Sequence, residues 1–170
     1  MMETNETIKT CRRLPGTEET LRFVSDWFWT SHVRAAMDER FVSDHYTVYH
    51  LMDDILKGDC KVYGVFETKD DLCLGFDGLV FGWIDKDGYY ECHLAFSRYA
   101  DAMECAKMIE AVLRKENPGV RGIVGYIPDR NRAARMFAKR YGCKDNGIRR
   151  NMLFYKDDAV YPCREFRKDF

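Results

Sequence analysis

The chain has 170 residues, of which 46% are hydrophobic and 14% aromatic, and its formal net charge is -1. This length favours one domain, residues 1–170, which can bury roughly 70% of its unfolded surface without disulfide or metal staples. The near-neutral charge argues against a general nucleic-acid binder, because such proteins usually carry a clear basic excess.

The N-terminal residues MMETNETIKTCRR are polar, and the longest apolar runs of the chain are only a few residues long. They predict neither a signal peptide nor a membrane-spanning helix. The seven cysteines form no CxxC pair, which argues against a disulfide framework and against a zinc ribbon. We therefore expect a cytoplasmic protein with no membrane partner and no bound metal.

The first half of the chain predicts a strand, two helices and three further strands. Their ranges are 8–14 for the strand, a helix capped by Thr17, a helix at about 44–56, and strands at 61–66, 72–84 and 89–96. The segment 72–84 is long and rich in glycine, so we predict either one long strand or a bulged one. A turn at 68–71 and a tight turn ending at Gly88 would join these strands into an antiparallel meander.

The second half alternates helices and strands. Apolar residues at helical spacing predict a helix that begins near Ala102 and ends at Asn117-Pro118-Gly119. A strand at 120–127 follows, then a helix opened by Asn131, then strands at 148–156 and 160–166 across Asp157-Asp158. The strand-helix-strand crossover implies that strands 89–96 and 120–127 are parallel. A ligand is expected at their carboxyl ends, beside residues 96–102.

The segment NRAARMFAKRYGC, residues 131–143, has an Asn and three alanines where larger apolar residues could stand. It resembles the last helix motif of the GNAT acyl-CoA N-acyltransferases, with matches at Asn131, Ala134, Phe137 and Gly142. The order of elements from about Ile8 to Phe166 is similar too. The resemblance implies an α/β (α+β) GNAT fold, with a mostly antiparallel sheet of about seven strands, one central parallel pair and about four helices.

The resemblance also implies acetyl-CoA as co-substrate. Asn131 would bind its pantetheine arm, although Asn is equally a favoured helix cap. The family's phosphate loop corresponds to residues 98–103, where Arg98 matches but Asp101 and Met103 replace the two glycines. The residues expected to bind the cofactor are Leu94, Phe96, Arg98, Tyr99, Ala100, Asp101, Ala102, Asn131, Ala134 and Phe137.

The general base would come from the strand before the phosphate loop. Glu91 and His93 alternate onto one face of that strand, and either could accept a proton from an amine. The alternative is a polar outer face without a catalytic role. Many relatives place a tyrosine, the acid for the leaving thiolate, where this chain has Ala138. Tyr126 or Ser97 could replace it, or the thiolate could leave unassisted.

We therefore expect an N-acetyltransferase that acts on a primary amine of a small molecule or peptide and does not bind nucleic acid. A homodimer is one assembly to consider, since the sequence leaves the oligomeric state open. The alternative is a GNAT-like domain that has lost catalysis and serves as a binding or assembly module. It is similar to divergent GNAT-like proteins of phages and prophages, and the missing glycines and tyrosine favour it.

Overall fold

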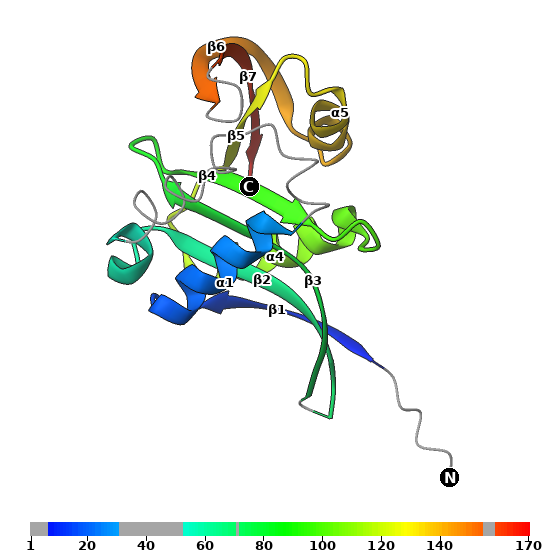
Figure 1. Ribbon diagram of the computed structural model, residues 1–170. Helices are drawn as coiled ribbons and strands as arrows, with labels where there is room; N and C mark the ends of the chain where they lie inside the picture. Colours follow the sequence, from blue (N-terminus) through cyan, green and yellow to red (C-terminus); the bar gives the residue numbers. More distant parts are fainter. Residues whose placement is uncertain (1–6, 31–52, 71, 155–158) are drawn as a thin grey trace.

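The computed structural model describes residues 7–30, 53–70, 72–154 and 159–170. Its centre is a seven-stranded mixed sheet with the order β1-β2-β3-β4-β5-β7-β6 (Figure 1). The strands are β1 Ile8–Leu14, β2 Lys61–Lys69, β3 Leu72–Ile84, β4 Tyr89–Phe96, β5 Gly122–Pro128, β6 Lys144–Phe154 and β7 Ala159–Asp169. The labelled helices are α1 Glu18–Trp29, α4 Ala102–Glu116 and α5 Arg132–Arg140.

The sheet confirms the predicted topology. Strands β1 to β4 form an antiparallel meander, and β4 pairs with β5 in parallel. Strand β7 inserts between β5 and β6, antiparallel to both. Gly88, whose φ is +84°, closes the predicted turn between β3 and β4. The central parallel pair therefore joins the N-terminal meander to the C-terminal hairpin.

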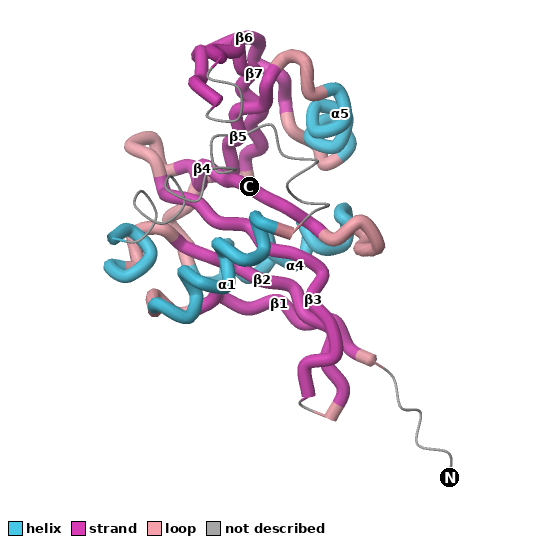
Figure 2. Tube along the Cα trace, in the orientation of Figure 1, coloured by secondary structure: helices cyan, strands magenta, loops and turns pink. Residues whose placement is uncertain are grey.

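Helices α1 and α4 cover opposite faces of the meander (Figures 1 and 2). Under α1, Leu21 and Val24 pack in a core cluster with Val62, Leu79 and Phe81. On the other face, α4 buries residues spaced as predicted against a second cluster. Its members include Cys105, Ile109, Leu113, Tyr63, Val65, Val80 and Tyr90. Helix α5 lies beside β5 to β7 (Figure 1).

Each labelled helix begins at a side-chain cap. The Thr17 hydroxyl accepts a hydrogen bond from the Thr20 amide at 3.3 Å, which confirms the predicted start of α1. Asp101 caps α4 and Asn131 caps α5. These caps satisfy backbone N–H groups that have no partner within their own helix.

Strand β3 is bulged rather than regular. Its pairing with β2 shifts between Val65 and Phe66 and again between Glu67 and Thr68, so Asp77 and Leu74 are extra residues on β3. Strand β2 continues to Lys69, and the predicted turn at 68–71 therefore starts too early. Residues 53–57 are helical, as predicted. The rest of the predicted 44–56 helix and the turn at Asp157-Asp158 lie outside the described residues.

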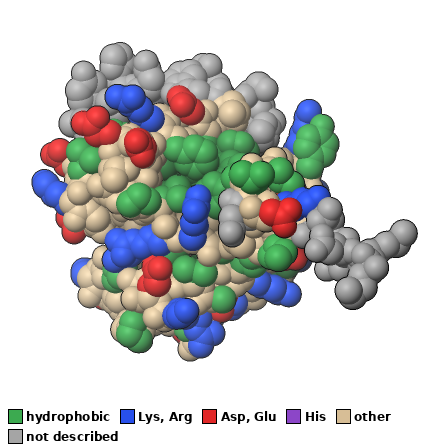
Figure 3. Space-filling view, turned by 90° about the horizontal axis from the view of Figure 1, so that it is seen from below, with side chains coloured by type: hydrophobic (Ala, Val, Ile, Leu, Met, Phe, Trp, Pro, Cys, Tyr) green, Lys and Arg blue, Asp and Glu red, His purple; other side chains and the backbone are tan. Residues whose placement is uncertain are grey.

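The surface has a mixed character. Hydrophobic side chains gather near the centre of the face in Figure 3, and charged side chains of both signs are scattered around them. All seven cysteines are free thiols, and Cys60, Cys105 and Cys163 are buried. Within the described ranges, no helix is long and apolar enough to cross a membrane.

Two glycines of β5 differ in how closely the neighbouring backbone approaches them. A Cβ atom on Gly122 would lie 2.1 Å from the Lys168 carbonyl oxygen, whereas one on Gly125 would meet nothing closer than 4.0 Å. We expect Gly122→Ala to lower the free energy of unfolding by about 1–3 kcal/mol, because overpacking displaces β7. Gly125→Ala is the matched control, and thermal unfolding is the measurement. Equal melting temperatures for the two variants would contradict the close approach of β5 and β7.

Candidate functional site

Strands β4 and β5 pair over only three residues each. Tyr89 to Glu91 face Gly122 to Val124, and within these fully described strands no later residue joins the parallel ladder. Both strands continue, to Phe96 and Pro128, so their carboxyl-terminal halves lie apart. The sheet is therefore open between its two central strands.

A cavity of about 450 Å³ occupies this opening. Side chains from both faces of β4 line it, Leu94 and Phe96 from one face and His93 and Ala95 from the other. Most of its other lining residues are apolar and come from α4, β5 and α5. This volume lies within the usual range of small-molecule sites. The cavity reaches both faces of the sheet, so a ligand could extend between the strands.

Small residues of α4 and α5 leave room for the cavity. Ala102 and Ala106 of α4 and Ala133, Ala134 and Ala138 of α5 all line it. Phe137 lines it as well, with its ring 6.4 Å from that of Phe96 and stacked on Tyr141 at 6.1 Å. The alanines that set residues 131–143 apart in the sequence thus face an open space rather than a tightly packed neighbour.

The two candidate bases have different surroundings. His93 lines the cavity and is only 7% exposed, and its ring stacks on Phe81 at 5.2 Å. Glu91 does not line the cavity. Its carboxylate receives hydrogen bonds of 3.2 and 3.5 Å from the guanidinium of Arg150. His93 is therefore placed to contact a ligand, while Glu91 is held in an ion pair.

Asn131 is both a helix cap and a lining residue of the cavity. Its side-chain oxygen accepts a hydrogen bond from the Ala134 amide at 3.1 Å, which confirms the cap. The NH2 group of the side chain takes no part in this bond. Pantetheine binding by Asn131 stays a prediction that the cap does not contradict.

The loop before α4 departs from a phosphate cradle. The Asp101 carboxylate accepts hydrogen bonds of 3.0 Å from the amides of Met103 and Glu104. Arg98 and Tyr99 are exposed, with the guanidinium 4.8 Å from the ring centroid. Of residues 98–102, only Ala102 lines the cavity. A carboxylate thus occupies amides that an anion at this helix end would need.

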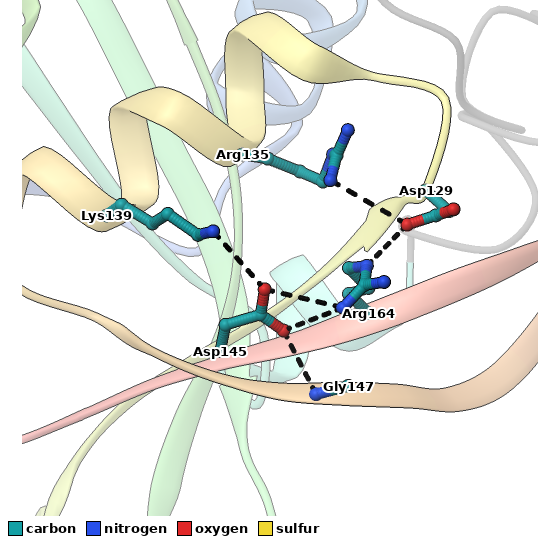
Figure 4. A network of polar contacts seen from close by, with 6 residues as sticks. All are labelled: Asp129, Arg135, Lys139, Asp145, Gly147 and Arg164. Atoms are coloured by element: carbon teal, nitrogen blue, oxygen red, sulfur yellow. Dashed lines mark hydrogen bonds and ion pairs between the residues drawn. The ribbon is translucent and has the colours of Figure 1, made fainter.

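A polar network holds α5 against the end of the sheet (Figure 4). Arg164 donates to Asp129 and, at 3.3 Å, to Asp145. Arg135 and Lys139 of α5 form ion pairs with these two carboxylates at 3.8 and 3.6 Å. The hydrogen bond from Arg164 lowers the pKa of Asp129, and that from the Gly147 amide lowers the pKa of Asp145. The network joins α5 to β5, β6 and β7.

A second polar group forms one wall of the cavity. The Tyr141 hydroxyl donates to the carboxylate of Glu110, and Lys168 donates to the same carboxylate at 2.5 Å. Burial of Glu110 alone raises its pKa, but the hydrogen bonds from Lys168 and Tyr141 hold that pKa below its ordinary value of 4.5. Burial raises the pKa of Tyr141, and the hydrogen bond to Glu110 raises it further. The sequence pattern predicts no role in the site for Glu110 or for the Tyr141 hydroxyl; a local signal for Glu110 is its charge beside Ile109, which helical spacing places on the apolar face.

Solved acetyltransferases share this fold at low sequence identity. One from Salmonella typhimurium, which modifies the N-terminal serine of a 50S ribosomal subunit protein, matches with a TM-score of 0.68 and 14% identity over 95% of each chain. Spermidine N-acetyltransferase from Vibrio cholerae, in complex with CoA and spermine, matches with a TM-score of 0.66 and 15% identity over 95% of each chain.

A microcin self-immunity acetyltransferase, in complex with acetyl-CoA and AMP, gives a TM-score of 0.64 and 12% identity over 95% of this chain and 93% of the other. No protein-family model and no curated protein sequence matches the chain. The chain therefore has the fold of the GNAT acyl-CoA N-acyltransferases, as the sequence predicts. A particular likeness to phage or prophage proteins stays a prediction.

The lowered pKa of Glu110 predicts how stability depends on pH. A carboxyl whose pKa is lowered in the folded state stabilises the protein above about pH 4.5, and this contribution disappears as pH falls through the folded-state pKa. Glu110→Gln should therefore lower the free energy of unfolding at pH 7, by on the order of 1–2 kcal/mol. The difference from wild type should shrink below about pH 4.5.

Melting temperatures measured across this pH range check the prediction. Glu116→Gln, which changes an exposed carboxylate on the same helix, is the matched control and should stay close to wild type. A Glu110→Gln deficit that is constant with pH would show that the ionised carboxylate is not its source.

Proposed function

We propose that the protein is an acyl-CoA-dependent N-acyltransferase that transfers acetyl from acetyl-CoA to a primary amine of a small molecule or peptide. The observation that carries the proposal is the cavity between the parted β4 and β5, which joins both faces of the sheet. It gives an acyl thioester and an amine separate approaches to one point. The acetyltransferases with the same fold, two of them in complex with CoA or acetyl-CoA, support this choice of donor.

The pantetheine arm would enter along α4 and α5, beside Ala102, Ala134 and Phe137, with the Asn131 amide as a hydrogen-bond donor. Leu94 and Phe96 belong to the part of β4 that has lost β5 as a partner. Backbone groups along this edge need hydrogen-bond partners, which the amides of pantetheine could supply. The close approach of the alanines would then position the thioester in the opening.

His93 is our candidate for the general base. A neutral imidazole in the cavity could take a proton from the ammonium form of the acceptor, so that the amine attacks the thioester carbonyl carbon. The carbon–sulfur bond then breaks and CoA leaves as a thiolate. Glu91, paired with Arg150, would act at most by positioning this part of β4.

In the part of the chain that the structure describes, no side chain is an obvious acid for the leaving thiolate. Ala138 occupies the position of the family's tyrosine, and the Tyr141 hydroxyl donates to Glu110. The hydroxyl of Tyr126 lies 3.2 Å from a carboxylate oxygen of Glu165. Because a thiol has a pKa of about 8.5, its thiolate is a stable leaving group near neutral pH. We propose that it leaves unassisted and is protonated by solvent.

The second candidate is a GNAT-like binding or assembly module without catalysis. Two observations favour it, the Asp101 carboxylate on the amides of Met103 and Glu104 and the alanine at position 138. Both would weaken the use of acetyl-CoA without disturbing the fold. Binding and turnover separate the two candidates.

Acetyl-CoA should raise the melting temperature of the protein, because it binds the folded state. His93→Gln should keep this shift while reducing acetyl transfer to a panel of polyamines and peptide amines by about 100-fold or more. Differential scanning fluorimetry and release of free thiol are the measurements. No shift at millimolar acetyl-CoA would exclude the enzyme, and a shift without transfer in the wild type would favour the binding module.

Asp101→Gly should free the amides of Met103 and Glu104 and remove a charge that repels phosphate. We expect the affinity for acetyl-CoA to rise several-fold, since glycine is a tolerated N-cap that costs only a few tenths of a kcal/mol. Asp101→Ser, which keeps a capping oxygen without the charge, separates the two causes. Isothermal titration calorimetry gives both affinities. An unchanged affinity in Asp101→Gly would mean that the phosphates do not use these amides even when the amides are free.

A further inference from the structure

The outer side of α4 borders a second cavity, of about 300 Å³. Met103, Lys107, Glu110, Ala111 and Arg114 line it from α4, and Arg140, Tyr141 and Lys168 line it from the end of α5 and from β7. The inner side of α4, at Ala102, Ala106 and Leu113, faces the apolar cavity described above. The two cavities therefore run along neighbouring faces of the same helix and share Glu110.

The outer cavity, called the basic pocket below, is strongly cationic. Lys107, Arg114, Arg140 and Lys168 line it, and Glu110 is the single carboxylate among the described residues of its lining. Lys168 and Arg114 both pair with Glu110, at 2.5 and 3.6 Å. In the part of the chain that the structure describes, no carboxylate pairs with Lys107 or Arg140. The pocket thus keeps a positive charge that Glu110 does not neutralise.

Such a pocket is unusual in a chain whose net charge is -1. Cations from three elements converge on it, and like charges held close together destabilise one another unless an anion joins them. Arginine and lysine side chains are the groups that proteins use for phosphate, by bidentate hydrogen bonds and by charge. The pocket therefore has the chemistry of a phosphate site.

Its position relative to the apolar cavity agrees with this chemistry. Glu110 and Tyr141 line both cavities, and the hydrogen bond between them forms part of the partition. At the start of α4, Ala102 lines the apolar cavity and the next residue, Met103, lines the basic pocket. A ligand with an apolar arm in one cavity could turn around this first helical turn and place an anionic end in the other.

We propose that the basic pocket binds phosphate groups, in place of the amide cradle that Asp101 occupies. The ligand class is a phosphorylated nucleotide, and the phosphates of CoA are the source that we expect, an identification that rests on the proposed function. Lys107 and Arg140 contact the phosphates, while Glu110 holds Lys168 and Arg114 at the edge of the pocket. Met103 and Ala111 supply the apolar floor.

The experiment uses the full chain and adenosine 3′,5′-bisphosphate, the nucleotide end of CoA, in isothermal titration calorimetry. Lys107→Gln and Arg140→Gln should each weaken its binding by about tenfold, the loss of one charge-assisted hydrogen bond. The matched controls are Lys115→Gln on α4 and Arg132→Gln on α5, which change exposed cations outside both cavities. They should stay within about twofold of wild type. Unchanged affinity in both pocket variants would overturn the proposal.

Two further titrations identify the source of the phosphate. If CoA is the ligand, CoA should bind more tightly than dephospho-CoA, or inorganic pyrophosphate should compete with it, and both pocket variants should abolish that effect. Either result supports the pocket and assigns it to the 3′-phosphate or to the pyrophosphate. Binding of all these probes that is equal in wild type and pocket variants would place the phosphates elsewhere.

The outcome is separable from that of the proposed function. A shift of melting temperature with acetyl-CoA that is the same in wild type, Lys107→Gln and Arg140→Gln overturns the basic pocket and leaves the acyltransferase standing. Binding of the bisphosphate that depends on Lys107 and Arg140, without any response to acetyl-CoA, supports the pocket and excludes the enzyme. Melting temperatures without ligand verify that every variant is folded.

Discussion

The early end of the parallel ladder between β4 and β5 is the constraint on which the rest of the structure depends. Three residue pairs hold the strands together, and beyond them the backbone groups that face the gap must find partners other than a neighbouring strand. Close contact between β5 and β7 at Gly122 holds β5 in place where it still pairs with β4. The network around Arg164 fixes α5 beside the carboxyl-terminal end of β5, where β4 no longer pairs with it. The opening is thus bounded by rigid elements on each side, which a binding site needs if it is to be formed before its ligand arrives.

Helix α4 acquires two different environments from this arrangement. Ala102, Ala106 and Leu113 face the apolar cavity, and Lys107 and Arg114 face the basic pocket. Between them, Glu110 joins Tyr141 and Lys168, so a polar link separates an apolar compartment from a cationic one. This division suits a ligand that is apolar at one end and anionic at the other. It also explains why a carboxylate lies on a helix face that is otherwise basic or apolar.

The shared fold does not by itself settle the chemistry, because one fold supports many sites. Asp101 and Ala138 are two of the positions where this chain departs from the motifs of the family that it resembles. Each changes a local interaction. The carboxylate of Asp101 accepts the amide hydrogen bonds that a bound anion would otherwise take at the start of α4. Ala138 leaves space in the cavity wall where the family that the chain resembles has a tyrosine hydroxyl. The cavity, its small residues and His93 are compatible with the proposed acyl transfer, in which these two positions would change how the donor is held and how its thiolate leaves.

The sequence by itself determined the elements whose signals are local. Helical spacing, caps such as Thr17, the turn at Gly88 and the crossover from β4 to β5 were all predictable, as was the alternation that puts Glu91 and His93 on one face. Tertiary structure decided what each of these residues meets. Arg150, 59 positions away, holds Glu91, while His93 enters the cavity. Lys168 completes the basic pocket, and Arg164 binds carboxylates 35 and 19 positions away. The bulge at Asp77 and the three-pair ladder arise between strands. Periodicity reports which face a side chain occupies, and only folding decides what lies opposite that face.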